Sequence, residues 1–185
     1  MKIFKIIIII FIFLTCSVKA DLDQNLIKEI KQGGKLIFIR HAYAPGGGDP
    51  QNFNLDDCSS QRNLNDDGRE QSKNIGALFL KYNLEINNVY SSEWCRCKET
   101  ATIAFKKFKT KKFLNSFYSV QFAKNRKKQV KDFKDFIKKW NKKDNLIFVT
   151  HYVVISEILN YAPQSGEVVI ADKNLNILDT LEIGY

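Results

Sequence analysis

The sequence has few of the residues that mark fibrous, disordered or membrane-spanning proteins. Its 185 residues include three prolines and nine glycines, too few for a collagen-like repeat or a low-complexity segment. The longest apolar run, Ile6 to Leu14, has nine residues, whereas a membrane-spanning helix needs about 20. Hydrophobic residues make up 44% of the chain and charged residues 26%, as in ordinary soluble domains. This composition predicts one globular domain and argues against a polytopic membrane protein.

The positive charge of the chain is local. The formal net charge is +9, but five basic residues lie within residues 106–112 and ten more within residues 124–143, the latter against two acids. Outside these two stretches acidic residues outnumber basic ones, so no nucleic-acid partner is expected. Apolar residues at helical spacing run through the second stretch: Val130, Phe133, Ile137 and Trp140. This pattern predicts a helix with a solvated lysine face, and an acidic ligand or a membrane surface is the alternative.

The first twenty residues have the pattern of a signal peptide. Lys2 and Lys5 precede the apolar run from Ile6 to Leu14, and small residues lead up to Ala20. Cleavage after Ala20 would leave a single domain, residues 21–185, in the periplasm or outside the cell, with no stable membrane anchor. A lipoprotein attached through Cys16 is the alternative, although a small residue normally precedes a lipidated cysteine.

An exported chain would carry its three remaining cysteines into an oxidising compartment. Cys95 and Cys97 are two residues apart, which disfavours a bond between them if they lie on a helix. We therefore expect Cys58 to pair with one of them, leaving one free thiol. Spacings typical of zinc sites are missing, so neither a metal nor another cofactor is expected.

Helical and strand patterns alternate along the chain after residue 21. The alternation predicts a three-layer α/β/α sandwich with a mostly parallel sheet. Helices are expected over 22–30, from an Asn65 cap to residue 82, from a Ser91 or Ser92 cap to residue 108, over 124–143 and over 153–159. Strands are expected over 36–39, 89–90 and 146–149, with a closing hairpin over 168–171 and 175–183.

The chain has only two histidines, and each directly follows one of the two clearest buried strands. His41 follows Leu36–Arg40, and His151 follows Leu146–Thr150. Ligands of open α/β sheets bind beyond the carboxyl ends of the strands, so both histidines are expected at one site. Packing alone does not account for two equivalent positions, one of them preceded by Arg40.

The residues around these strand ends resemble the signatures of the histidine phosphatase superfamily, which has the phosphoglycerate-mutase-like fold. Arg40-His41-Ala42 resembles the Arg-His-Gly signature, and residues 63–71 resemble a Leu-Thr-x-x-Gly-x-x-Gln helix start. Residues 91–101 resemble the segment Ser-Ser-x-x-x-Arg-x-x-x-Thr-Ala. Residues 149–151 and 166–169 resemble the strand bearing the second histidine and the strand that often follows it. The resemblance runs from about residue 35 to residue 170.

The resemblance implies a phosphatase that hydrolyses a small anionic phosphomonoester. His41 would be the nucleophile and would form a phosphohistidine. Arg40 and Arg96 would bind the phosphate oxygens, because a guanidinium is planar and stays charged. His151 would be a second donor to the transferring phosphoryl group.

One expected group is missing from the resemblance, the general acid that protonates the leaving oxygen. In many family members a glutamate follows a Leu-Asn pair, but Ser116 follows Leu114-Asn115 here; in another branch an acid follows the second histidine, but Tyr152 stands here. Glu93 and Glu167 are the nearest candidates. The alternatives are a catalytically weak or inactive phosphate-ligand-binding protein of the same fold, and a basic protein that docks on anionic envelope polymers.

A polar insert separates the first histidine from the next helix. Gly46-Gly47-Gly48 lacks the Lys-Ser/Thr of a P-loop and is expected to form a flexible rim of the pocket. Residues 49–62 are expected to form a lid that faces the substrate, with Cys58 tying it down.

Overall fold

The described residues, 22–185 of a computed structural model, form a six-stranded sheet in the order β3-β2-β4-β1-β5-β6. The expected signal peptide over residues 1–20, and Cys16 with it, lies outside the described residues. The strands are β1 (Leu36–Arg40), β2 (Val89–Ser91), β3 (Lys109–Thr110), β4 (Leu146–Thr150), β5 (Val168–Ala171) and β6 (Ile177–Leu181).

The middle of the sheet is parallel. Strand β1 pairs with β4 in register from Leu36 opposite Leu146 to Arg40 opposite Thr150. The β4–β2 and β2–β3 pairs are also parallel. The closing hairpin is antiparallel, because β5 runs against β1 and β6 runs against β5. Only β5 therefore runs against the other five strands, which confirms the predicted mostly parallel sheet.

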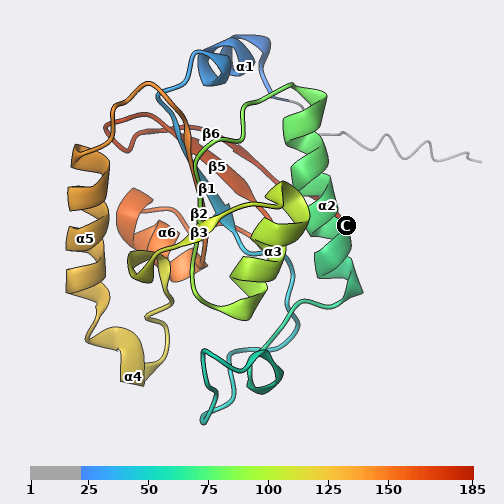
Figure 1. The fold of residues 1–185 in the computed structure, drawn as a ribbon, viewed down its shortest axis with the longest axis vertical. Helices are drawn as coiled ribbons and strands as arrows, with labels where there is room; N and C mark the ends of the chain where they lie inside the picture. The colour runs from blue at the N-terminus through green and yellow to red at the C-terminus, as the bar shows by residue number, and fades with distance from the viewer. Residues whose placement is uncertain (1–21) are drawn as a thin grey trace, which may run out of the picture.

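Helices cover both faces of the sheet (Figure 1). Helices α2 and α3 lie on one face, while α5 and α6 lie on the other, so the three predicted layers are present. The helices are α1 (Gln24–Lys31), α2 (Asp66–Lys81), α3 (Cys95–Phe105), α4 (Val120–Ala123), α5 (Arg126–Lys138) and α6 (Tyr152–Leu159), with short 3-10 turns η1 (Cys58–Ser60) and η2 (Lys112–Leu114).

The continuous apolar runs of the central strands follow from this sandwich. Successive side chains of a strand point to opposite faces, so a strand covered on both faces needs apolar residues throughout. Ile37 and Ile39 pack in the core on the α2 and α3 side. Leu36 and Phe38 pack in the second core, where Phe133 of α5 contacts Phe38. The strands are thereby fixed in register, and with them the residues at their ends.

The start of α2 is held against the loop after β1. Asn65 caps the helix as predicted, since its Oδ1 accepts a hydrogen bond of 3.0 Å from the backbone N–H of Gly68. A Cβ at Gly68 would lie 2.0 Å from the carbonyl oxygen of Tyr43, so only glycine allows this approach. Asn65 thus caps the start of α2, and Gly68 lets the helix approach the loop that follows His41.

The predicted cap of α3 is wrong. Helix α3 begins at Cys95 behind Trp94, and no side chain at the N-cap position bonds to it. The Ser91 hydroxyl donates to the carbonyl of Ser92, and the Ser92 hydroxyl lies against His151. Gln61 satisfies the helix end instead, because its Oε1 accepts a 3.0 Å hydrogen bond from Cys95 N–H.

The basic residues of α5 form a solvated face. Lys128 and Lys131 are exposed and pair along the helix with Asp132 and Asp135. The structure therefore agrees with the predicted lysine face. Between residues 22 and 185, no helix combines the length and the hydrophobicity that crossing a membrane would require.

Candidate active site

A cavity of about 740 Å³ lies where β1 and β4 end, in the size range of small-molecule sites. Both histidines line it, together with residues of the insert and of the loop around α4. Its charged lining residues are three arginines and one aspartate: Arg40, Arg62, Arg96 and Asp49. With neutral histidines the wall therefore carries a surplus of two positive charges, which suits a phosphate dianion.

The parallel pairing of β1 and β4 brings the two histidines together. The backbone N–H of His41 donates to the Thr150 carbonyl at 2.8 Å, which continues the sheet by one residue. The centres of the His41 and His151 rings are 5.4 Å apart, and both side chains are almost fully buried. The sequence prediction of one site at adjacent strand ends is thus reflected in the geometry.

The hydrogen bonds of His41 fix which of its nitrogens holds a lone pair. Nδ1 lies 2.8 Å from the carbonyl oxygen of Ala42, which only accepts, so Nδ1 carries the proton. Nε2 then carries the lone pair and accepts a 3.2 Å hydrogen bond from Nε of Arg96. The nitrogen that could attack phosphorus thus lies directly beside an arginine that could hold the phosphate.

The surroundings also keep His41 neutral. Burial and the positive charge of Arg96 hold the pKa of His41 well below the usual histidine value. Burial, Arg96 and His41 together lower the pKa of His151 in the same way. A neutral imidazole is the form that attacks an electrophile, so His41 is ready to act as a nucleophile at neutral pH.

Arg96 is held on the first turn of α3. Its backbone carbonyl accepts a 2.7 Å hydrogen bond from the Thr100 hydroxyl, which in turn accepts one of 3.1 Å from the N–H of Ala42. The threonine of the sequence motif therefore ties α3 to the loop that carries His41. This contact sets the position of Arg96 relative to the His41 ring.

Arg40 and Arg62 complete the positive wall. Nη1 of Arg40 donates to the Pro163 carbonyl at 2.8 Å, and Nη1 of Arg62 donates to the Ala44 carbonyl. Nε of each arginine is buried, and neither has a hydrogen-bond partner within the described part of the chain. Buried donors without partners are rare in folded proteins, and both of these belong to arginines that line the cavity.

His151 is oriented by the end of β2. Its Nε2 lies 2.9 Å from the hydroxyl of Ser92, and the ring of Trp94 packs edge-on against the imidazole. Nδ1 of His151 has no hydrogen-bond partner among residues 22–185. The Ser92 hydroxyl has one proton and also lies 3.2 Å from the acceptor Oδ1 of Asn115, so the tautomer of His151 depends on which of the two acceptors this proton bonds.

Asp49 is the one carboxylate that lines the cavity, counting residues 22–185. Its Oδ1 lies 2.7 Å from Nη1 of Arg96 and its Oδ2 lies 3.1 Å from Nη2, which makes a bidentate ion pair. The indole N–H of Trp94 donates to Oδ2 and the backbone N–H of Arg62 donates to Oδ1. Burial alone would raise the pKa of Asp49, but its hydrogen bonds and ion pair with Arg96 lower it overall.

Neither glutamate suggested by the sequence lines the cavity. Glu93 accepts a 2.6 Å hydrogen bond from the side chain of Asn115, which joins β2 to the loop before α4. The buried Glu167 accepts from the Tyr161 hydroxyl and from the backbone N–H of Gln164. Glu167 thus orders the segment whose Pro163 carbonyl accepts the hydrogen bond from Arg40, without lining the cavity itself.

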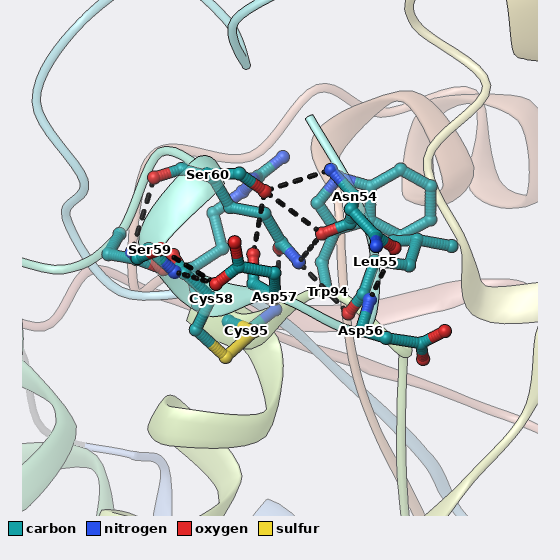
Figure 2. The surroundings of a disulfide bond; sticks show 12 residues. Asn54, Leu55, Asp56, Asp57, Cys58, Ser59, Ser60, Trp94 and Cys95 are labelled. Atoms are coloured by element: carbon teal, nitrogen blue, oxygen red, sulfur yellow. Dashed lines mark hydrogen bonds between the residues drawn. A yellow bond between two sulfur atoms is a disulfide. The ribbon is translucent and has the colours of Figure 1, made fainter. Parts of the chain in front are cut away.

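The insert is fastened to α3 by a disulfide. Cys58 and Cys95 are bonded, with their Cα atoms 5.6 Å apart, as the sequence led us to expect for one of the two possible partners. Figure 2 shows this bond beneath the compact turn from Asn54 to Ser60, next to Trp94. Gln61 strengthens the attachment, because its amide donates to the Asn54 carbonyl while its oxygen bonds to α3. The disulfide and the hydrogen bonds of Gln61 therefore fix the path of the insert beside Arg96.

Cys97 is the free cysteine among the described residues, and it is fully buried 3.5 Å from Nε2 of His151. Burial raises the pKa of the Cys97 thiol to about 12, so it stays protonated and is a poor nucleophile. Nowhere in residues 22–185 do three or more His, Cys, Asp or Glu side chains gather as a metal site would need.

The outer part of the cavity is glycine-rich and aromatic. Gly46-Gly47-Gly48, Phe53, Tyr118, Phe122 and Tyr152 line it, and the rings of Phe53 and Phe122 lie 5.8 Å apart. Tyr118 is 60% exposed. No lysine lines this cavity in the described part of the chain, so the lysine face of α5 does not contribute to it.

Comparison with known proteins defines the fold. No protein-family model matches the sequence, and no curated protein is significantly similar to it. Among solved structures, the Thermus thermophilus protein TTHB049 is similar with a TM-score of 0.58 and 14% identity, over 80% of this chain and 99% of that one. A phosphoglycerate mutase from the same organism gives a TM-score of 0.55 and 13% identity, over 80% and 99% of the two chains.

A third similar structure, from Agrobacterium tumefaciens, is assigned as the phosphohistidine phosphatase SixA. Its TM-score is 0.58 at 14% identity, and the match covers 81% of this chain and 98% of that one. At these identities the likeness concerns the fold. The chain has the phosphoglycerate-mutase-like α/β fold that its motifs led us to expect.

The structure brings four predicted residues together and adds three that the sequence analysis missed. Arg40, His41, Arg96 and His151 all line the cavity. The additions are Asp49, Arg62 and Trp94. Asp49 and Arg62 are the first and last residues of the insert that was expected to face the substrate. A charged residue at each end of such a loop was the sequence feature that could have identified them as site residues.

Proposed function

We propose that the protein is a histidine-dependent phosphatase that hydrolyses a small phosphomonoester through a phosphohistidine on His41. The observation that carries the proposal is the pairing of the His41 Nε2 lone pair with Arg96, in a cavity with a surplus of positive charge. Nucleophile and anion-binding group are thus in contact before any substrate arrives. When a phosphoryl group binds, Arg96 has to turn its N–H groups from Nε2 and Asp49 to the phosphoryl oxygens, which frees the Nε2 lone pair for attack.

In the first step the Nε2 lone pair of His41 attacks phosphorus, and the bond from phosphorus to the leaving oxygen breaks. The proton on Nδ1 keeps its hydrogen bond to the Ala42 carbonyl, which holds the ring in place while positive charge grows on it. Arg96, Arg40 and His151 would surround the phosphoryl oxygens, which carry the negative charge in the transition state. In the second step water attacks phosphorus, the bond from phosphorus to Nε2 breaks with its electron pair returning to the nitrogen, and the phosphate leaves with the protons of the water.

The size and lining of the cavity limit the substrate. The positive charges come from Arg40 at the end of β1, Arg62 at the end of the insert and Arg96 on α3, whereas the aromatic residues of the lining are neutral. A substrate with one phosphoryl group and an uncharged remainder fits this distribution better than a polyanion does. The Cys58–Cys95 disulfide supports the part of the proposal that places the protein in an oxidising compartment, the periplasm or the cell exterior.

The test is phosphate release from a reactive aryl phosphate by the oxidised protein and by the variant His41→Ala. We expect turnover by the wild type and none by His41→Ala. Lys128→Ala, an exposed change on α5, serves as the control and should behave like the wild type. If the folded wild-type protein releases no phosphate, a non-catalytic phosphate-binding role replaces this proposal.

A further inference from the structure

The site has a nucleophile and cations, but its proton donor has not been assigned. An alcohol leaves phosphorus slowly unless its oxygen receives a proton as the bond breaks. The arginines cannot supply a proton, because a guanidinium does not deprotonate in proteins. Glu93 and Glu167 are bonded away from the cavity, to Asn115 and to Tyr161 and Gln164.

We infer that Asp49 is the general acid that protonates the leaving oxygen. The inference rests on the proposed phosphatase function. Asp49 is the single carboxylate on the cavity wall within residues 22–185, and Arg96 is its direct neighbour. Arg96 also donates to His41, so one guanidinium lies between the nucleophile and this carboxylate.

The position of Asp49 relative to the mouth of the cavity suits this role. His41 lies at the buried floor, 2% exposed, whereas Gly46, Gly47 and Gly48 are exposed at the rim. Attack from the floor drives the leaving group towards the rim, since the attacking and leaving atoms are roughly in line at phosphorus. Asp49 follows directly after the rim glycines, and its carboxylate, 11% exposed, lies on the cavity wall against Arg96 and the backbone N–H of Arg62.

Asp49 forms its ion pair with Arg96 in the site without substrate. A phosphoryl group that binds Arg96 brings two negative charges to the guanidinium that Asp49 now occupies. Like charges at one site favour protonation of one of them. The other charged and titratable groups that interact with Asp49 are Arg62 and the protonated thiol of Cys97. The net charge of the cavity therefore decides the protonation of Asp49, and substrate binding changes that charge.

The proton can arrive with the substrate. The second ionisation of a phosphomonoester has a pKa of about 6, so part of the substrate is a monoanion below neutral pH. Its proton passes to Asp49 when Arg96 binds the phosphoryl oxygens. Asp49 then gives the proton to the leaving oxygen while the bond from phosphorus to His41 Nε2 forms. In the second step the Asp49 carboxylate takes a proton from the attacking water, and the bond from phosphorus to nitrogen breaks.

The test compares Asp49→Asn with the wild type on two substrates, an alkyl phosphate and nitrophenyl phosphate. Asparagine keeps the shape of Asp49 and cannot donate an acidic proton. For the alkyl phosphate we expect kcat to fall by about 100-fold or more, the usual loss for a general acid. For nitrophenyl phosphate we expect a loss of less than about tenfold, because nitrophenolate leaves without a proton. Turnover of this substrate also shows that the variant is folded.

Asp56→Asn is the matched control, since Asp56 is exposed on the same loop and does not line the cavity. It should change neither rate by more than about twofold. Equal losses on both substrates in Asp49→Asn would overturn the inference, because Asp49 would then act only by holding Arg96. No loss on either substrate would also overturn it. A wild-type protein that is inactive on both substrates would overturn the proposed function itself.

Discussion

The Cys58–Cys95 disulfide should contribute a large part of the stability of the protein. It closes a loop of 37 residues in sequence, which contains the whole of α2 as well as the end of the insert. The loss of denatured-state entropy from a loop of that length is worth about 4 kcal/mol at 25 °C. Domains of this size unfold with a free energy of roughly 5 to 15 kcal/mol, so the bond is a substantial share of the total.

The perturbation is the double variant Cys58→Ser, Cys95→Ser, and the assay is urea unfolding of the variant and of the oxidised wild type. We expect the free energy of unfolding to fall by about 4 kcal/mol. Reduction should lower the stability of the wild type by a similar amount and leave the variant unchanged, which is the control for the thiols. A fall of less than about 1 kcal/mol would refute the reasoning, since the insert would then be held without the bond.

The disulfide should also matter for activity. It fastens the insert, and hence Asp49 and Arg62, to the first residue of α3, next to Arg96. Temperatures well below the midpoint of unfolding separate this local effect from global unfolding. We expect the double variant to have a raised KM for an aryl phosphate under such conditions, since the positive wall is less well ordered.

Three further predictions concern the buried charges and the rim. The folded state keeps His41 and His151 neutral while the unfolded chain binds protons below pH 6.5, about the ordinary histidine value, so acidification favours unfolding. Between pH 7 and pH 5.5 each histidine should lower the free energy of unfolding by about 1.3 kcal/mol. Urea unfolding of His151→Gln should therefore show about half of the wild-type decrease in this free energy, and equal decreases would contradict the prediction. Arg96→Lys keeps the charge but not the fork, and kcat/KM for an aryl phosphate should fall by about 100-fold, whereas an unchanged value would place the phosphate elsewhere. Tyr118→Ala should raise KM for an aryl phosphate about 3- to 10-fold and leave inhibition by inorganic phosphate unchanged, and an effect on both would indicate a general disturbance of the site.

The central strands and their histidines could be predicted because the physical signals are local. A run of four apolar residues, followed by one polar residue and a histidine, defines a buried strand and its end, as in Leu36–Arg40 and Leu146–Thr150. Parallel pairing then places both ends at one edge of the sheet. The resemblance motifs added Arg96, whose position depends on the threonine one helical turn later.

The insert and the start of α3 could not be predicted in this way. Residues 44–63 have no periodicity, and their path depends on the disulfide and on the side chain of Gln61. The sequence predicted the Ser92 hydroxyl as a possible helix cap, yet this hydroxyl lies against His151. The first N–H of α3, that of Cys95, instead donates to Oε1 of Gln61, which is distant in sequence. The pairing of Asp49 with Arg96 was missed for the same reason, since it joins residues 47 positions apart in sequence.

The most direct test of the central claim is to trap the covalent intermediate. The oxidised wild-type protein is mixed with an aryl phosphate and quenched in alkali, because alkali preserves phosphohistidine. The protein is then digested, and the masses of the peptides are measured by mass spectrometry. The account predicts one added phosphoryl group on the peptide that contains His41, lost on acid treatment and absent from His41→Ala. A phosphoryl group on His151 or on a hydroxyl side chain, or turnover without any phosphoenzyme, would contradict it.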